Sequence, residues 1–577
     1  MVENDQEQNS TQDESMIEKR EKLLYQRNFQ KFGLNLNLTV TLGVGLFVLL
    51  FSTYALVNIE HANNFFFRIQ SSIIENFDWF FVLSGVFFIV VCFCLGFSKL
   101  GRVRLGGVHA TPDFSDFGWY SMLISAGMGV GLVFWSVGEP LQHISELPPI
   151  FDSSNVAKSS IATTFFHWGI HPWGIYALIS LALAFFAYNK QLPISFRSVF
   201  YPLLKDRIFG LAGDLIDIVA VLATLFGLAT SLGLGVQQIN SGLNFLLGVP
   251  FNTIIQIFLI IGIGVIASLS VLSGIDKGVQ FLSKLNMRIA GILIAVIFIL
   301  GPTGYIIATF SGAIGLYIND FIQSSFFISH YDKTWQGSWS IFYLAWWISW
   351  SPFVGMFIAR ISKGRTVKQL IFGVLIVPSI LSFLWLSVFG GTAIWINEKT
   401  SGDLLIIVQE NLPVALFEML AYFSQIFMMG TFVDISRIVL SVIATVLIII
   451  YFITSFDSGS LVIAKITSGG IENSPTKQKV SWVWLQGIVS ATLLVIGGEV
   501  VLETLQTAVI ASGLPFAIVL ILMSVSLIKA LKISYQYQKK VKRMDGVKKI
   551  ADGLKVIEEE DEEEEDTDVV EEEANTW

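Results

Sequence analysis

Residues 342–365 read FYLAWWISWSPFVGMFIARISKGR and have the length of a membrane span. Three indoles, those of Trp346, Trp347 and Trp350, lie near the middle of this stretch. Indoles of ordinary spans gather instead at the two membrane interfaces. Pro352 follows the cluster directly. A mid-span Trp cluster beside a proline predicts a helix that is broken around a cavity, and the alternative is a tightly packed, kinked helix.

The composition of the whole chain is that of a polytopic membrane protein. Of its 577 residues 53% are hydrophobic and only 14% are charged, which excludes a soluble domain. The net charge of −9 arises largely from acidic residues near the C-terminus. Cys92 and Cys94 lie two positions apart, so their side chains diverge on a helix and neither a disulfide nor a shared metal is expected.

Twelve segments are apolar over the roughly 20 residues that a span needs. They lie near residues 36–58, 78–98, 118–141, 164–188, 211–239, 252–273, 286–311, 339–361, 367–394, 435–464, 482–502 and 505–529. Every second loop carries at least three Lys or Arg residues, whereas the alternate loops carry at most one. This asymmetry predicts that both termini lie in the cytoplasm and that the protein crosses the plasma membrane many times.

The third span repeats the irregularity of the eighth. Gly127, Gly129 and Gly131 occupy alternate positions there, and each glycine costs a helix about 1 kcal/mol relative to alanine. Two interrupted spans that stand five spans apart cross the membrane in opposite directions. The pattern therefore predicts two five-helix halves of inverted topology, spans 3–7 and 8–12, in which paired broken helices hold substrate and ions near the midplane.

The fourth span adds a second group of aromatic residues. Trp168, Trp173 and Tyr176 fall within one arc of this helix, and Pro172 is expected to bend it. With the three indoles of the eighth span they offer up to six aromatic faces, which attract quaternary ammonium groups. Neither of these two stretches contains a carboxylate to anchor a primary amine, which favours a methylated cation. The alternative is a Trp-rich packing core.

Several polar residues are candidates for further sites. His167 and His171 share a helix face without an apparent carboxylate partner, so interhelical hydrogen bonds are expected rather than a metal site. Thr454 and Ser455 offer adjacent hydroxyls that suit a sodium ion, although such residues more often pack helices together. Asp457 is an acid inside or at the edge of a span and is functional by default, or else it caps local backbone or pairs with Arg360 or Lys363.

Five stretches resemble the betaine/carnitine/choline transporter family. They are GMGVGLVFWSVGEP (127–140), FHWGIHPW (166–173), ATLFGLATSLGLG (223–235), WWISWSPFVGMFIARISKGRT (346–366) and TSFDSGS (454–460). The resemblance implies an all-α protein of 12 transmembrane helices with the leucine-transporter fold after two leading helices, assembled as a homotrimer. It also implies import or exchange of trimethylammonium solutes, coupled in many members to sodium.

The resemblance assigns a substrate site by position. Its aromatic walls would be formed by Trp168, Trp173, Tyr176, Trp346, Trp347 and Trp350. Phe357 would lie along the inner exit, and the backbone at Gly127, Gly129 and Gly131 would meet the substrate carboxylate. One sodium site would involve Ser125, Met128, Tyr451, Thr454 and Ser455. A second sodium site would involve Phe353 and hydroxyls of the fifth span.

The same resemblance favours one function over its rivals. The fifth span lacks the Arg of sodium-independent exchangers, and Gly131 stands where proton-coupled choline carriers tend to have Asp. Sodium-coupled uptake of glycine betaine by a bacterial cell, for osmoprotection, is therefore expected. A choline or carnitine carrier and a non-transporting osmosensor remain alternatives. No enzymatic residue pattern, cofactor other than the sodium ion or nucleic-acid partner is expected.

The chain divides by composition into six parts. Residues 1–35 form an N-terminal tail, 36–116 two leading helices, 117–312 the first repeat, 313–334 an interfacial helix or loop, 335–530 the second repeat with an external cap at 401–430, and 531–577 a cytoplasmic tail. The tail is basic over 529–549 and acidic over 558–573. It is either disordered or an osmotic sensor whose basic part binds anionic lipid.

Overall fold

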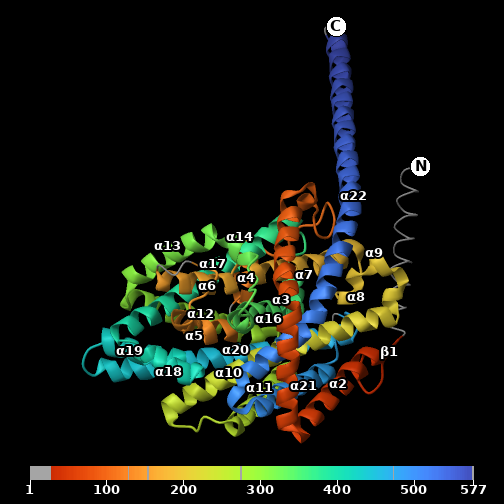
Figure 1. The fold of residues 1–577 in the computed structure, drawn as a ribbon. Helices are drawn as coiled ribbons and strands as arrows, with labels where there is room; N and C mark the ends of the chain where they lie inside the picture. The colour runs from red at the N-terminus through yellow and green to blue at the C-terminus, as the bar shows by residue number, and fades with distance from the viewer. Residues whose placement is uncertain (1–26, 128, 152–154, 273–275, 472, 575–577) are drawn as a thin grey trace.

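The computed structural model describes all residues except 1–26, 128, 152–154, 273–275, 472 and 575–577. Within the helices, the side chains of 276–281 and 546–574 are likewise not described. The described chain is a bundle of helices whose only strands are the antiparallel pair β1 (Asn28–Phe29) and β2 (Leu36–Asn37) (Figure 1). Ten helical segments among the described residues are long and apolar enough to cross a membrane, or eleven if one bent pair counts as a span.

The long helices follow the predicted spans closely. The helices of the first half are α2 (Leu38–Val57), α3 (Ile59–Phe97), η1 (Lys99–Arg102), α4 (Asp116–Gly127), α5 (Val130–Ser145), α6 (Val156–Trp168), α7 (Ile170–Lys190), α8 (Phe196–Val199), α9 (Tyr201–Leu204), η2 (Lys205–Phe209), α10 (Leu211–Leu247), α11 (Thr253–Leu272), α12 (Asp276–Leu300), α13 (Thr303–Asn319) and α14 (Phe321–Ser325).

The second half continues the same pattern. Its helices are α15 (Thr334–Gln336), the π-helical turn η3 (Gly337–Ile341), α16 (Phe342–Ile361), α17 (Val367–Lys399), α18 (Asp403–Glu410), η4 (Leu412–Val414), α19 (Ala415–Phe427), α20 (Phe432–Thr467), α21 (Thr476–Gly497), η5 (Gly498–Val500) and α22 (Val501–Ala574). The predicted cap at 401–430 is therefore helical.

Helix packing relates the two halves to each other. Helix α10 packs on α20, α11 on α21, and α7 on α17. The contact of α10 with α22 is matched by that of α20 with α12, and the contact of α10 with α21 by that of α20 with α11. The contact of α7 with α16 is likewise matched by those of α17 with α4 and α5. The contacts of α7, α10, α11 and α12 thus recur among α17, α20, α21 and α22.

The third span is interrupted, as its glycines predict. Helix α4 ends at Gly127 and α5 begins at Val130, with an angle of 59° between them. Gly129 has an extended backbone at the start of α5. The fourth span is also interrupted, at Gly169 between α6 and α7, three residues before the proline that was expected to bend it.

The prediction that the eighth span is a second broken helix is wrong. Helix α16 runs without interruption through Trp346, Trp350 and Pro352. A proline removes the backbone donor that would bond the carbonyl four residues earlier. Here the Ser351 hydroxyl donates to that carbonyl, on Ile348, over 2.6 Å. The Ser351 hydroxyl thus satisfies the carbonyl that Pro352 leaves without a backbone donor, and the helix continues. The irregular turn of this span lies before α16, in η3.

The seventh span also differs from its predicted range of 286–311. Helix α12 ends at Leu300 because Gly301 and Pro302 follow it, and proline lacks the backbone donor that a continuing helix needs. The separate helix α13 then packs on α6 and α17. The predicted boundary between the first repeat and an interfacial segment, at 312/313, therefore falls inside α13.

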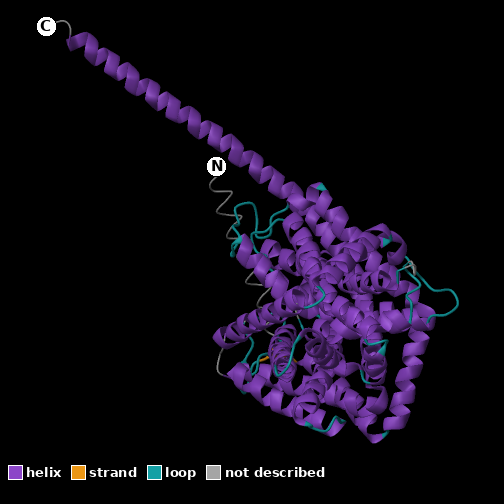
Figure 2. Cartoon of the chain, turned by 90° about the vertical axis from the view of Figure 1, so that its left-hand side faces the viewer, coloured by secondary structure: helices purple, strands orange, loops and turns teal. Residues whose placement is uncertain are grey.

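The C-terminal helix α22 leaves the bundle and projects far beyond it (Figures 1 and 2). Its backbone is helical to Ala574, so a disordered tail does not describe it. Glu and Lys, which dominate this segment, are good helix formers. Leu527, Leu531 and Gln538 are still buried against the bundle. The Gln538 side chain accepts from the Arg104 backbone N–H over 3.1 Å and donates to the Arg104 carbonyl over 3.0 Å.

Candidate functional site

The six predicted aromatic side chains gather where the end of α6 and the start of α7 meet α16. The Trp168 ring lies edge-on to that of Trp347, with 4.9 Å between centroids, and Trp346 stacks on Trp347 at 4.9 Å. Tyr176 is 6.4 Å from Trp347 and 6.5 Å from Trp350, and Trp173 is 5.3 Å from Tyr176. We call these six residues the aromatic cage. All of them except Trp350 are buried.

The interrupted third span closes one side of the cage. A Cβ added to Gly131 would lie 2.6 Å from the Trp346 ring, and one added to Gly127 would lie 2.9 Å from the Trp173 ring. Neither ring could stay in place against such an atom. Two of the three predicted glycines therefore admit indoles from α7 and α16. Gly129, between them, has more room, since its added Cβ would lie 3.9 Å from Trp350.

The cage surrounds a cavity of about 30 Å³. Its lining includes the six aromatic residues, the three glycines and Ser231. Two indoles are fixed by hydrogen bonds: Trp347 donates to the His167 carbonyl over 2.9 Å, and Trp346 donates to the Ser231 hydroxyl over 3.3 Å. Binding sites for small organic ligands usually occupy some 300 Å³ or more. The cage is thus closed in this conformation, and a ligand enters only when its rings move apart.

A larger cavity of about 360 Å³ adjoins the cage. We call it the vestibule. Ala126, Gly129, Trp350 and Ser455 line both cavities, so they separate the two. Phe357 lies in the vestibule rather than in the cage, which agrees with a place along an exit path. Arg360 and Lys465 line the vestibule too.

The predicted ion ligands that the structure describes lie around the vestibule. Ser125, Phe353, Tyr451, Thr454 and Ser455 all line it, and Met128 lies outside the described residues. The Thr454 hydroxyl donates to the carbonyls of Ile450 at 2.9 Å and Tyr451 at 3.1 Å. Because the proton faces the backbone, the lone pairs of this oxygen remain available to a cation.

The hydroxyls proposed to accompany Phe353 come from α10. Ser231 lines the cage rather than the vestibule, and Thr230 donates to the Leu505 carbonyl over 3.1 Å. Asp457 accepts from Ser270 on α11 over 2.9 Å, so its hydrogen-bond partner is neither Arg360 nor Lys363.

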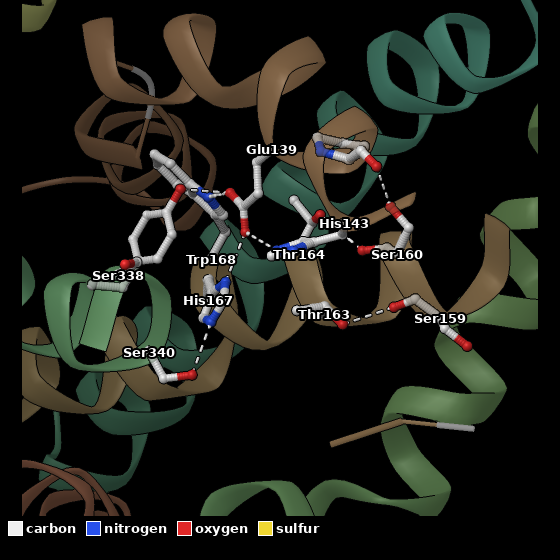
Figure 3. Close-up of polar contacts among 12 residues, drawn as sticks. Glu139, His143, Ser159, Ser160, Thr163, Thr164, His167, Trp168, Ser338 and Ser340 are labelled. Atoms are coloured by element: carbon white, nitrogen blue, oxygen red, sulfur yellow. Dashed lines mark hydrogen bonds and ion pairs between the residues drawn. The ribbon is translucent and has the colours of Figure 1, made fainter. Parts of the chain in front are cut away.

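The structure places a carboxylate beside His167, contrary to the expectation from sequence. The Nδ1 atom of His167 is 2.7 Å from Glu139 Oε1, and His143 Nε2 is 3.4 Å from the same oxygen (Figure 3). The expected interhelical hydrogen bonds are present for His167, which also meets Ser340 at 3.2 Å, whereas neither ring nitrogen of His171 has a hydrogen-bond partner among the described residues. His171 is buried against Phe166, with 4.4 Å between ring centroids.

These three residues have the donor types of a zinc site. Glu139, His143 and His167 offer ligand atoms within 4.8 Å of one another. Two ligands of a tetrahedral zinc ion lie roughly 3.3 Å apart, however, because each is about 2.0 Å from the metal. The 2.7 Å between Glu139 and His167 is instead a hydrogen-bond distance. The cluster is therefore described as a hydrogen-bonded network.

Residues 39–536 match the sequence family described as BCCT, betaine/carnitine/choline family transporter. The chain belongs to this transporter family. It is 42% identical to glycine betaine transporter 1 of Vibrio parahaemolyticus, across 91% of this chain and 99% of that protein. It is 42% identical to a glycine betaine/proline/choline transporter of the same organism, across 87% and 91%. A glycine betaine transporter of Bacillus subtilis is 40% identical across 82% and 91%.

Membership of the betaine/carnitine/choline transporter family fixes the broad class of the protein. It is a multi-pass membrane transporter and not an enzyme. The family resemblance expected from five short stretches thus extends over nearly the whole chain.

Sequence reasoning missed Glu139 and Tyr343 as part of the site. The signal for Glu139 was visible, because an acidic residue inside an apolar span is functional by default. Tyr343 gave no such signal: its hydroxyl donates to Glu139 across 204 positions of sequence, and only the folded arrangement of α5 and α16 brings the two side chains together.

Proposed function

We propose that this protein imports glycine betaine, or a closely related trimethylammonium osmolyte, into a bacterial cell across the plasma membrane. The observation that carries this proposal is the aromatic cage around a cavity without acidic lining residues. No Asp or Glu is among the described residues that line either the cage or the vestibule. A primary amine would need hydrogen-bond acceptors, whereas a trimethylammonium group needs aromatic faces. The names of the relatives support the same substrate class.

The proposed architecture has twelve spans, of which the last ten form an inverted repeat of five plus five. This architecture is supported by the helix contacts, because the contacts that α7, α10, α11 and α12 make resemble those that α17, α20, α21 and α22 make. One of the ten apolar segments contains both α21 and α22, which pack side by side after a left-handed residue at Gly498. Separating these two helices and adding the bent pair α4/α5 brings the total to twelve.

Transport would follow alternating access around the cage. The vestibule is lined by Arg360 and Lys465, which border the cation-rich loops. The positive-inside rule places these loops, and both termini, in the cytoplasm. With this orientation, the vestibule would open toward the cytoplasm and the protein would be inward-facing with its cage closed.

Sodium is proposed as the coupling ion. Tyr451, Thr454 and Ser455 of α20 face Ser125 of α4 across the vestibule next to the cage. Hydroxyl and carbonyl oxygens are suitable ligands for a hard monovalent cation, and the break in the third span frees carbonyls there. Coupling to sodium would let the cell accumulate the osmolyte for osmoprotection. A homotrimer, with anionic lipid at the C-terminal helix, is proposed as the assembly.

Uptake by the purified protein in proteoliposomes tests the function. Radiolabelled glycine betaine should accumulate under an inward sodium gradient and not in vesicles without protein. Failure to accumulate any trimethylammonium solute, with binding retained, would favour a non-transporting osmosensor. Competition by unlabelled choline, carnitine and proline distinguishes the alternative substrates, of which choline and proline are named for one relative.

A further inference from the structure

The acid Glu139 lies in the middle of the bundle, directly behind the cage. It is completely buried on α5, eight residues beyond Gly131, and lines neither cavity. Its Oε2 atom accepts from Trp168 Nε1 over 2.8 Å and from the Tyr343 hydroxyl over 2.5 Å. Trp168 is a wall of the cage, so one hydrogen bond joins the acid to a ring that lines the cavity (Figure 3).

The other oxygen of Glu139 meets two imidazoles. His167 Nε2 lies 3.2 Å from the Ser340 hydroxyl, whose proton it accepts when Nδ1–H donates to Glu139 Oε1 over 2.7 Å. This arrangement fits a neutral His167. His143 Nε2 lies 3.4 Å from Oε1, and neither of its ring nitrogens has a hydrogen-bond partner among the described residues. An ionised carboxylate can accept about four donors, and Trp168, Tyr343 and His167 supply three of them here.

No fixed cation offsets the charge of this carboxylate. Among the described residues, its ion-pair partners are only the imidazoles of His143 and His167, and no Lys or Arg reaches it. Buried charges in membrane proteins ordinarily have a partner of opposite sign. Neutral donors stabilise a carboxylate without cancelling its field, so an ionised Glu139 would place an uncompensated negative charge one indole away from the cavity.

We propose that Glu139 supplies the negative charge that holds a quaternary ammonium in the cage, and that it acts through the Trp168 ring without touching the substrate. A carboxylate that accepts from the indole N–H pushes electron density into the ring and strengthens its attraction for a cation. The low polarity of the surroundings strengthens it further. This inference rests on the proposed function and assigns Glu139 as a positioning and charge-supplying residue.

The arrangement explains selectivity for a methylated cation. Because Trp168 and Tyr343 occupy one carboxylate oxygen and the imidazoles face the other, no oxygen of Glu139 is directed into the cavity. A primary ammonium therefore gains no hydrogen bond there, yet every cation gains the electrostatic attraction. A trimethylammonium group has no N–H that needs an acceptor, so it gains the attraction without leaving a donor unsatisfied.

The competing interpretation is that Glu139 only orients Trp168. Glu139→Gln separates the two, because the amide keeps an acceptor oxygen for Trp168 and Tyr343 but removes the charge. Binding is measured by calorimetry on the full-length protein in detergent with sodium. The ligands are glycine betaine and 3,3-dimethylbutanoate, which has the same shape with carbon in place of the charged nitrogen.

A charge-supplying role predicts a selective effect. The dissociation constant of glycine betaine rises about tenfold or more, equivalent to about 1.4 kcal/mol, whereas that of 3,3-dimethylbutanoate changes about twofold or less. Equal weakening of both ligands would show that Glu139 only orients the ring and would overturn the proposal. Unchanged binding of both would overturn it as well. Tyr343→Phe, which removes one donor and keeps the charge, is the matched control and should affect both ligands alike.

A second variant guards against misfolding of the first. His143→Lys places an ammonium group beside Glu139 Oε1 and cancels the charge without removing the carboxylate. It should cause the same selective loss for glycine betaine. If the wild-type protein binds no trimethylammonium ligand, the proposed function itself fails. If the wild-type protein binds glycine betaine and both variants keep its preference over the carbon analogue, only the role of Glu139 fails.

Discussion

At the scale of single residues, Trp347 is the ring on which the cage depends most. It is stacked on Trp346, lies edge-on to Trp168 and is fixed through its N–H to the His167 carbonyl. Trp347→Leu removes an aromatic face and should raise the dissociation constant of glycine betaine about tenfold. Trp347→Phe keeps a ring and should lose less. Equilibrium binding measures both variants.

The control for this prediction is Trp395→Leu. Trp395 is a partly buried indole of α17 that packs on Phe427 and lines neither cavity. It should leave the affinity for glycine betaine unchanged. If Trp347→Leu binds glycine betaine as tightly as the wild type does, this ring is not part of the substrate site.

The hydroxyls of Thr454 and Ser455 carry the proposed link to sodium. Replacing both with alanine removes two oxygen ligands and should raise the half-saturating sodium concentration of uptake about tenfold, since hydrogen bonds and ligand contacts to charged groups contribute about 1.5–3 kcal/mol. Sodium titration of uptake in proteoliposomes measures the shift.

Thr445→Ala is the matched hydroxyl deletion on the same helix. Thr445 donates to the Ser441 carbonyl and lies outside both cavities. Its sodium curve should coincide with that of the wild type. If the curve of the double variant coincides as well, sodium does not bind at these hydroxyls.

The residues of the site were predictable from sequence to different degrees. The six aromatic residues lie in two stretches, and side-chain chemistry alone predicted a shared function for them. The three hydrogen-bond partners of Glu139 are 28, 29 and 204 positions away, and no periodicity in the sequence joins them to it. Local patterns predict which residues are unusual, whereas the packing of α5, α6 and α16 decides which of them meet.

At the scale of elements, helix α16 shows how a proline is accommodated in a span. Ser351→Ala removes the hydroxyl that satisfies the Ile348 carbonyl and should destabilise the protein by about 1 kcal/mol. In the Pro352→Ala background the same change should cost little, because the substituted alanine would donate its own backbone N–H to that carbonyl. Thermal unfolding of the four proteins in detergent gives the coupling. Equal effects of Ser351→Ala in both backgrounds would contradict this account.

This helix also shows where prediction from sequence stops. A proline beside a Trp cluster indicates a defect in backbone hydrogen bonding but does not say where the defect is repaired. The missing hydrogen bond is replaced by the hydroxyl of the neighbouring residue, Ser351, which could equally have faced a ligand. The glycines of the third span, by contrast, offered no hydroxyl at the break, and that helix is bent by 59° as predicted.

The helix α22 suggests where a regulatory truncation should be made. Removing residues from 529 onward would also remove the buried Leu531 and the Gln538 contacts with Arg104. Truncation after residue 557 keeps these contacts and deletes only the acidic stretch. If that stretch competes with lipid for the basic one, uptake should lose its dependence on internal ionic strength.

Uptake at several internal salt concentrations, in vesicles with anionic lipid, measures this effect. Replacing the acidic stretch by an uncharged Ser/Gly segment of equal length is the control for length. An unchanged dependence on ionic strength in the truncated protein would show that the acidic stretch is no sensor.

At the scale of the whole molecule, the proposed coupling to sodium would make transport electrogenic. Glycine betaine carries no net charge, so each cycle would move only the positive charge of sodium. An interior-negative potassium diffusion potential should therefore accelerate uptake by at least about twofold, since moving one charge across 100 mV is worth about 2.3 kcal/mol. Uptake that ignores both the potential and the sodium gradient would indicate exchange or facilitated diffusion.

The wall between the two cavities has a consequence for stoichiometry. Ala126, Gly129, Trp350 and Ser455 line both cavities, so the proposed substrate ring Trp350 and the proposed sodium ligand Ser455 belong to the same wall. A solute that leaves past Trp350 must disturb the oxygen cluster around Ser455. Substrate and sodium would then pass the same wall, and neither could be released without the release of the other.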